Sequence, residues 1–284
     1  MTALFPQKLF PKASFRTVAL AFAVLPLSML VAPVAQAQTA YFAGAQSTVP
    51  TSGLRAPYGV AVDGSGNVFI ADTVNNRVLK ETLSGGGYTE STIGSSLINP
   101  YGVAVDGSGN VYIADNLHNR VLKETLSGGS YTQSMVPTSG LSQPFGVAVD
   151  GSGNVYITDT YNNRVLKETV SGSSYTQSTV GSGLSQPFGV AVDGSGNVYI
   201  TDTYNNRVLK ETLSGSSYTQ SSVGSGFPSP EGVAVDDSGN VYITDTSINR
   251  VLKIATAGVN FDSVNIGASS TSISLTFTFD SAGT

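Results

Sequence analysis

The chain repeats one pattern of apolar and polar residues five times. The segment Pro-Tyr-Gly-Val-Ala-Val-Asp at residues 57–63 recurs, with small changes, at Pro100, Pro144, Pro187 and Pro230, so the period is 43 or 44 residues. Residues 141–180 and 184–223 differ at only two positions. A fixed period of this length indicates a repeat architecture in which each copy is one supersecondary unit.

Each copy predicts four short strands. In the third copy, the strand-like runs are residues 146–150, 154–159, 164–169 and 175–180, and turn-forming Gly, Ser and Asn residues separate them. No window has a helical period of useful length. Four antiparallel strands in about 43 residues are typical of one β-propeller blade, which buries its two faces against neighbouring blades. A β-sandwich is the alternative fold, but it does not require five copies of one sequence.

The ends of the repeat region predict how the ring closes. Residues 47–54 mirror residues 134–141, which indicates a fourth strand standing before the first copy. The fifth copy supplies strands at 232–236, 240–245 and 250–254 but no matching fourth strand. We therefore expect the strand at 41–49 to complete the last blade and to close an all-β ring of five four-stranded antiparallel blades. An open arc, or a sixth blade contributed from elsewhere, is the alternative.

The repeat unit also has a family resemblance. The pattern Gly-Val-Ala-Val-Asp-x-x-Gly-Asn-Val-Tyr-Ile-x-Asp-x-x-x-Asn-Arg-Val, present across residues 39–255, resembles the NHL repeat. The resemblance implies a β-propeller and, in most members, a surface that binds protein or another ligand. Closed NHL propellers often have six blades, so five copies are a departure. Some NHL-like propellers are lyases that act on peptides or antibiotics, and resemblance to those implies metal ions and histidines.

The chain offers little for such a metal site. Its one histidine, His118, occupies a turn position held elsewhere by Asn75, Asn162, Asn205 and Ile248. One imidazole does not make a multi-histidine site, so we expect no metal, no cofactor and an exposed turn residue. The Asp63–Asn67 segment resembles the start of a calcium loop, but valines stand where an EF-hand needs Gly and Glu. We interpret it as a turn capped by its Asp and Asn; weak calcium binding at the rim stays open.

Two repeated sets of residues are the candidate sites. In every copy an Asp ends one strand five residues before an Arg that starts the next, which favours a structural ion pair across the hairpin. These pairs are Asp72–Arg77, Asp115–Arg120, Asp159–Arg164, Asp202–Arg207 and Asp245–Arg250. The loops entering the first strand and those joining the second and third strands share one end of a blade, and they predict an apolar binding face. Its candidate residues are Tyr58, Tyr101, Phe145, Phe188, Leu117, Tyr161 and Tyr204. The alternative is that the aromatic residues after proline pack between blades.

The two ends of the chain differ from the repeats. Residues 1–37 combine three basic residues, an apolar run at 18–31 and a closing Ala-Gln-Ala, which are the parts of a secretory signal peptide. A retained membrane anchor is the alternative. Residues 38–255 are the propeller, and residues 256–284 resemble the first strands of an immunoglobulin-like domain that is incomplete here. The chain has no cysteine, which excludes disulfides and thiolate metal sites.

The net charge of the chain narrows the range of possible functions. Removing residues 1–37 takes 3 of the 14 Lys and Arg and none of the 19 Asp and Glu, which leaves 11 against 19 and a net charge of −8. An acidic chain is a poor partner for nucleic acid. We expect a secreted, non-enzymatic scaffold in the periplasm or at the cell surface, without a membrane span, that binds a protein, peptide or glycan on one face. The alternatives are a lyase or hydrolase with a site at the channel mouth, and a spacer in a longer surface protein.

Overall fold

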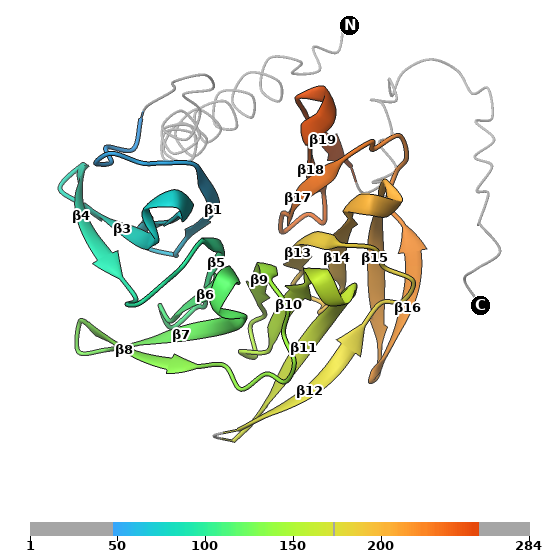
Figure 1. Ribbon diagram of the computed structural model, residues 1–284, viewed down its shortest axis with the longest axis horizontal. Helices are drawn as coiled ribbons and strands as arrows, with labels where there is room; N and C mark the ends of the chain where they lie inside the picture. The colour runs from blue at the N-terminus through green and yellow to red at the C-terminus, as the bar shows by residue number, and fades with distance from the viewer. Residues whose placement is uncertain (1–47, 173, 256–284) are drawn as a thin grey trace, which may run out of the picture. The chain divides into compact units, whose positions relative to one another are not determined.

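The computed structural model describes residues 48–172 and 174–255, and these form five antiparallel sheets (Figure 1). All five lie in one compact unit that begins at Thr51. Four sheets have four strands each, and the fifth has three in the described ranges. The predicted signal peptide, the C-terminal domain and most of the strand at 41–49 lie outside the described residues, so all three stay predictions.

Each sheet follows the chain strand by strand, and the strands fall where the repeat predicts them. The first strands are β1 (Pro57–Val62), β5 (Pro100–Val105), β9 (Pro144–Val149), β13 (Pro187–Val192) and β17 (Pro230–Val235). The second strands are β2 (Val68–Asp72), β6 (Val111–Asp115), β10 (Val155–Asp159), β14 (Val198–Asp202) and β18 (Val241–Asp245). The third strands are β3 (Arg77–Ser84), β7 (Arg120–Ser127), β11 (Arg164–Ser171), β15 (Arg207–Ser214) and β19 (Arg250–Ile254). The fourth strands are β4 (Gly87–Ile93), β8 (Ser130–Met135), β12 (Ser174–Val180) and β16 (Ser217–Ser222).

A short 3-10 turn joins the second strand to the third in every sheet. These turns are η1 (Thr73–Asn75), η2 (Asn116–His118), η3 (Thr160–Asn162), η4 (Thr203–Asn205) and η5 (Thr246–Ile248). Each ends on an asparagine in the left-handed region, such as Asn163 at φ 54°. Asparagine tolerates that region because its side chain is short and polar. Within the described ranges, no helix is long and apolar enough to cross a membrane.

The sheets are the blades of a β-propeller. First strands of successive sheets pack on one another, β1 on β5, β5 on β9, β9 on β13 and β13 on β17. Figure 1 shows these strands gathered on the inner side, with the fourth strands outermost. The Val and Ala side chains of all five first strands line a cavity of about 370 Å³ at the end opposite the 3-10 turns.

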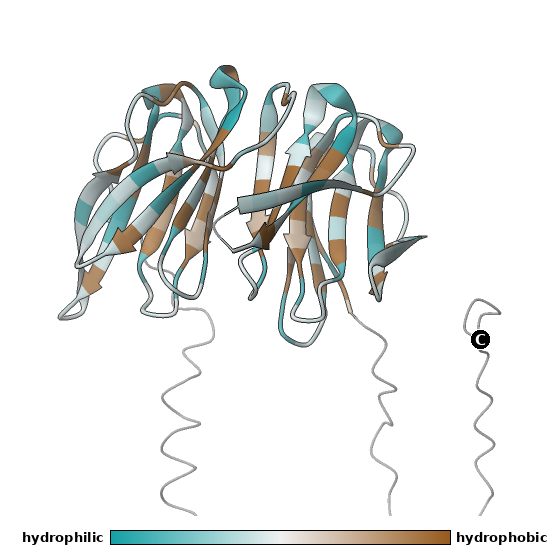
Figure 2. Ribbon diagram, turned by 90° about the horizontal axis from the view of Figure 1, so that it is seen from below, coloured by the Kyte–Doolittle hydropathy of each residue, from teal (hydrophilic) through white to brown (hydrophobic). Residues whose placement is uncertain are grey.

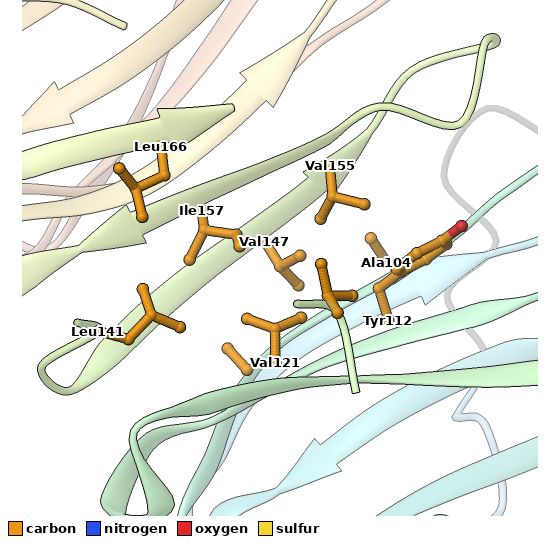
Figure 3. Close-up of a cluster of buried hydrophobic side chains, with 10 residues drawn as sticks. Ala104, Tyr112, Val121, Leu141, Val147, Val155, Ile157 and Leu166 are labelled. Carbon is orange, nitrogen blue, oxygen red and sulfur yellow. The ribbon is translucent and has the colours of Figure 1, made fainter. Parts of the chain in front are cut away.

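The hydrophobic core lies between the blades rather than inside any one of them. Figure 3 shows Tyr112 and Val121 of the second blade pointing toward Val147, Val155 and Ile157 of the third, and all five are buried. The sequence of the second strands alternates apolar and polar residues, which would suit a strand with one exposed face. Every residue of β10 is nevertheless buried, because a neighbouring blade covers each face. Figure 2 shows apolar residues recurring along the strands of every blade.

Within the described ranges, the two outer faces of the blade series have no neighbouring blade. Val60 of β1 is 64% exposed, whereas its counterpart Val103 of β5 is 6% exposed. Val251 of β19 is 70% exposed, whereas its counterpart Val165 of β11 is fully buried. Within these ranges, the first and fifth blades each leave exposed a face that the inner blades bury.

Candidate functional site

The loops that enter the first strands and the 3-10 turns lie together at one end of the propeller. The Tyr161 N–H in η3 donates to the carbonyl of Ser142 at 3.2 Å, and the Val74 N–H in η1 donates to Arg55 O at 3.2 Å. Equivalent bonds link the other turns to their entering loops. The expectation that these two groups of loops share one end of the blade is confirmed.

A buried aspartate fixes each entering loop to its turn. In the third blade, Asp159 Oδ1 accepts the Ser142 N–H at 2.7 Å, and Oδ2 accepts Asn162 Nδ2 at 2.9 Å and Arg164 Nε at 2.6 Å. The corresponding ion pairs join Asp72–Arg77, Asp115–Arg120, Asp159–Arg164, Asp202–Arg207 and Asp245–Arg250 at 2.6–3.0 Å. All five aspartates are fully buried. Their repetition in every blade gives them an architectural role, since each positions the loop that leads into the site.

In the first blade these contacts also keep the aspartate, Asp72, ionised. Burial by itself would raise the pKa of Asp72, because desolvation disfavours the ionised form. Hydrogen bonds from the Arg55 N–H, Asn75 and Arg77 outweigh burial and bring the pKa of Asp72 below its usual value. The carboxylate is therefore ionised in the folded protein at neutral pH.

Four aromatic residues form one continuous stack at this end. The ring centroids lie 4.8 Å apart for Tyr58 and Tyr101, 4.2 Å for Tyr101 and Phe145, and 4.5 Å for Phe145 and Phe188. Separations in this range are favourable for tilted and edge-to-face rings. We call these four residues the aromatic ladder. They line a cavity of about 250 Å³ together with Glu231, Thr244 and the glycines Gly59, Gly102, Gly146 and Gly232.

The glycine after each ladder residue is what lets the rings meet. A Cβ at Gly102 would lie 2.5 Å from the carbonyl oxygen of Phe145, and one at Gly59 would lie 2.4 Å from that of Tyr101. Real Cβ atoms do not approach backbone this closely, so the first strands can crowd together only at glycine. In the sequence Pro-aromatic-Gly, the aromatic residue therefore supplies the ring, and the glycine allows the neighbouring first strand to come close enough for the rings to stack.

Glu231 stands at the end of the ladder where the fifth blade would have a ring. Its Oε1 accepts the hydroxyl of Thr246 at 2.8 Å. In the inner blades the equivalent threonine donates instead to the next blade, as Thr160 does to Pro187 O and Thr203 to Pro230 O, both at 2.7 Å. In the described ranges no blade follows the fifth, so Thr246 bonds to Glu231.

The predicted binding residues divide into two groups. Tyr58, Tyr101, Phe145 and Phe188 line the cavity, whereas Leu117, Tyr161 and Tyr204 sit on the 3-10 turns and do not. Tyr161 and Tyr204 are 54% and 63% exposed. Burial raises the pKa of Tyr101, and its neighbours Tyr58 and Tyr161 add to the shift. The turn residues thus surround the cavity without forming its wall.

His118 takes the place of an asparagine in the second blade. Its Nδ1 lies 2.9 Å from Asp115 Oδ2, where Asn75 and Asn162 make the same contact in their blades. At the opposite end, the calcium-like loops have their carboxylates occupied, since Asp63 accepts the Ser65 and Asn67 backbone N–H groups and Asn67 Nδ2. In the part of the chain that the structure describes, no group of three His, Cys, Asp or Glu residues could hold a metal ion.

Comparison with known protein families assigns the sequence to a family. A model of the virginiamycin B lyase family matches residues 44–270. The chain belongs to that family. No curated protein sequence matches it.

Several solved structures are similar to this member of the virginiamycin B lyase family at low sequence identity. One is a catalytically inactive virginiamycin B lyase from Staphylococcus aureus with quinupristin, at 18% identity, TM-score 0.56, and 75% coverage of each chain. The nidogen/laminin complex matches at 22% identity and TM-score 0.62, covering 73% of this chain and 78% of that one. A gluconolactonase from Xanthomonas campestris matches at 16% identity and TM-score 0.56, covering 71% and 76%. These likenesses support the propeller fold, and the NHL resemblance itself stays a prediction.

The lyase resemblance implies a metal held by histidines, and the residues present do not fit one. The inactive Staphylococcus enzyme carries an alanine in place of a histidine. The present chain has one histidine, and its Nδ1 is taken by a buried aspartate.

Sequence reasoning missed two features of the site. Glu231 follows a proline like the four ladder residues, so the repeat alignment could have singled it out as the one acidic member of an aromatic series. The carboxylates of Glu81, Glu124, Glu168 and Glu211 are buried, each with at least one oxygen that has no hydrogen-bond partner. Their signal is the alternation of the third strand, which places each of these glutamates on the same side as a buried leucine.

Proposed function

We propose that the chain is a secreted ligand-binding propeller of the virginiamycin B lyase family and that its binding site is the cavity lined by the aromatic ladder. One observation carries the proposal: four rings from four blades meet in an unbroken stack at the wall of a 250 Å³ cavity. Cavities lined by aromatic side chains with a few polar groups are the usual form of small-ligand sites.

The size of the cavity sets the kind of ligand. About 250 Å³ is slightly below the range of drug-sized pockets, which favours one side chain, one sugar ring or a small ring system as the anchoring group. The exposed Tyr161 and Tyr204 would contact the rest of a longer peptide or glycan. The scaffold positions the wall rigidly, because each entering loop is tied to a buried aspartate.

The test is binding of the full chain to a panel of peptides and glycans, measured by calorimetry. The variant Tyr101→Leu/Phe145→Leu keeps apolar bulk but removes two rings, and we expect it to lose saturable binding at an unchanged melting temperature. Tyr161→Ala/Tyr204→Ala should weaken binding only for longer ligands. Tyr88→Ala, on the outer strand β4, is the matched control and should change nothing. Equal binding by the ladder variant and the unaltered chain would refute the proposal.

A second candidate function is that of an enzyme, and family membership is the observation that favours it. The family is named for a lyase, and a similar structure is a gluconolactonase, which leans against the expectation of a non-enzyme. Glu231 is the acidic group at the cavity and would be the candidate proton acceptor. Incubation with quinupristin followed by chromatography tests this function. Conversion by the unaltered chain that disappears in Glu231→Gln would establish it, and an unchanged compound would count against it.

A further inference from the structure

The cavity has one charged residue in its wall, and that residue is acidic. Among the described residues that line it, Glu231 is the only ionisable carboxylate, and none is Lys, Arg or His. Thr246 occupies Glu231 Oε1, whereas no hydrogen bond to Oε2 is present in the described ranges. Oε2 is therefore available to a ligand.

Five arginines at the same end already have carboxylate partners. The arginine that follows each 3-10 turn is paired with a buried aspartate, as Arg207 is with Asp202 at 2.6 Å. The same guanidinium groups donate to carbonyls of the entering loops, such as Arg207 Nη2 to Gly183 O at 2.8 Å. They stabilise the loops, so they do not offset the charge of Glu231 inside the cavity.

The other end of the ladder offers a ring with one neighbour. Tyr58 stacks on Tyr101 but has no second ring partner in the described ranges, and it is 60% exposed. Tyr58 and Glu231 line the same cavity. The faces of aromatic rings attract cations, most strongly when the cation is an ammonium or guanidinium with a low cost of desolvation.

We infer that the cavity binds an alkylammonium group, held between the π faces of the aromatic ladder and the carboxylate of Glu231. This inference rests on the proposed binding function and specifies its ligand class. It also fits the acidic balance of the chain, whose formal net charge is −5 before any cleavage. Glu231 would repel an anionic ligand of the same shape, and a neutral ligand would lack the ion pair with it.

The test compares two small probes of equal shape, choline and its uncharged carbon analogue 3,3-dimethylbutan-1-ol. Calorimetry with the full chain should give an affinity for choline about tenfold higher than for the alcohol, the size expected from one cation–π contact with a nearby carboxylate. Glu231→Gln should reduce this ratio, because it removes the carboxylate and leaves only the contact with the rings. Asp237→Asn is the matched control, because it removes one carboxylate from the turn at the opposite end of the same blade and should leave the ratio unchanged.

The outcomes separate this inference from the function on which it rests. Equal affinities for the two probes in the unaltered chain, or a ratio that survives Glu231→Gln, would overturn the inference. If both probes bind equally and both are lost in Tyr101→Leu/Phe145→Leu, the aromatic cavity remains the binding site and only the charge preference is wrong. If neither probe binds, the alkylammonium inference is wrong, and the peptide and glycan panel decides the proposed function separately.

Discussion

Arg164 Nε donates to Asp159 Oδ2 at 2.6 Å, and the aspartate is fully buried while the arginine is about one-third exposed. The other oxygen of Asp159 accepts the backbone N–H of Ser142, three residues before Phe145. One carboxylate thus links the hairpin of the third blade to the loop that carries a ladder residue. The same arrangement recurs in the other blades.

We expect Asp159→Asn to lower the free energy of unfolding by about 3 kcal/mol, because it breaks a buried ion pair and leaves its hydrogen-bond donors poorly matched. Chemical denaturation measures this change. Asp237→Asn removes an exposed aspartate and should cost less than about 0.5 kcal/mol. Equal effects of the two substitutions would show that the buried pair does not stabilise the blade.

Because of the buried glutamates, the protein should be more stable at mildly acidic pH than at neutral pH. Burial raises the pKa of Glu168 to about 7, and burial also raises the pKa of Glu124 and of Glu211. The folded chain then holds protons that the unfolded chain releases near its ordinary pKa of 4.5. Stability should therefore fall as pH rises from 4.5 to 7, by about 3 kcal/mol for Glu168 alone.

Thermal melting between pH 4.5 and 8 tests this prediction, and Glu168→Gln should flatten part of the slope. Below pH 4 the opposite effect takes over, because hydrogen bonds lower the pKa of Asp72 and Asp193 despite their burial. Protonation of those aspartates removes stability as the pH falls. A melting temperature that rises steadily from pH 4.5 to 7 would contradict the assignment of the glutamates as buried and unpartnered.

Gly102→Ala should destabilise the protein by about 2 kcal/mol or more, since the new Cβ would lie 2.5 Å from Phe145 O and 2.9 Å from Val147 N. Backbone atoms cannot yield as a flexible side chain can. Gly107→Ala is the matched control in the same blade, because nothing lies within 4 Å of its added Cβ. Urea denaturation of both variants checks the prediction, and a neutral Gly102→Ala would show that the first strands are not closely packed.

Val251→Ala should cost less than about 0.5 kcal/mol, whereas Val165→Ala should cost about 2 kcal/mol. The two valines hold the same position in their blades, but Val251 is 70% exposed and Val165 is fully buried. Guanidinium denaturation of the full chain measures both. An equal cost would mean that something covers the fifth blade in solution, as the predicted closing strand at 41–49 would require.

The sequence by itself determined the blades. The 43-residue period, the turn residues and the alternation within each copy predicted the strand positions, because these are local properties of the chain. The spacing of Asp159 and Arg164 likewise predicted their pairing, since residues at the start and end of a tight hairpin lie opposite one another. Pro-aromatic-Gly marked the rings that form the ladder.

Only the tertiary structure decided how the five copies contact one another. The rings of Tyr101 and Phe145 are 44 residues apart in the chain, and whether they stack or separate depends on how far each blade rotates from the last. A blade's place in the series likewise decides that Val251 is exposed, that Glu168 is buried and that Thr246 bonds to Glu231. Near-identical sequences thus acquire different environments from their place in the series, because burial and charge pairing depend on neighbours that no single repeat contains.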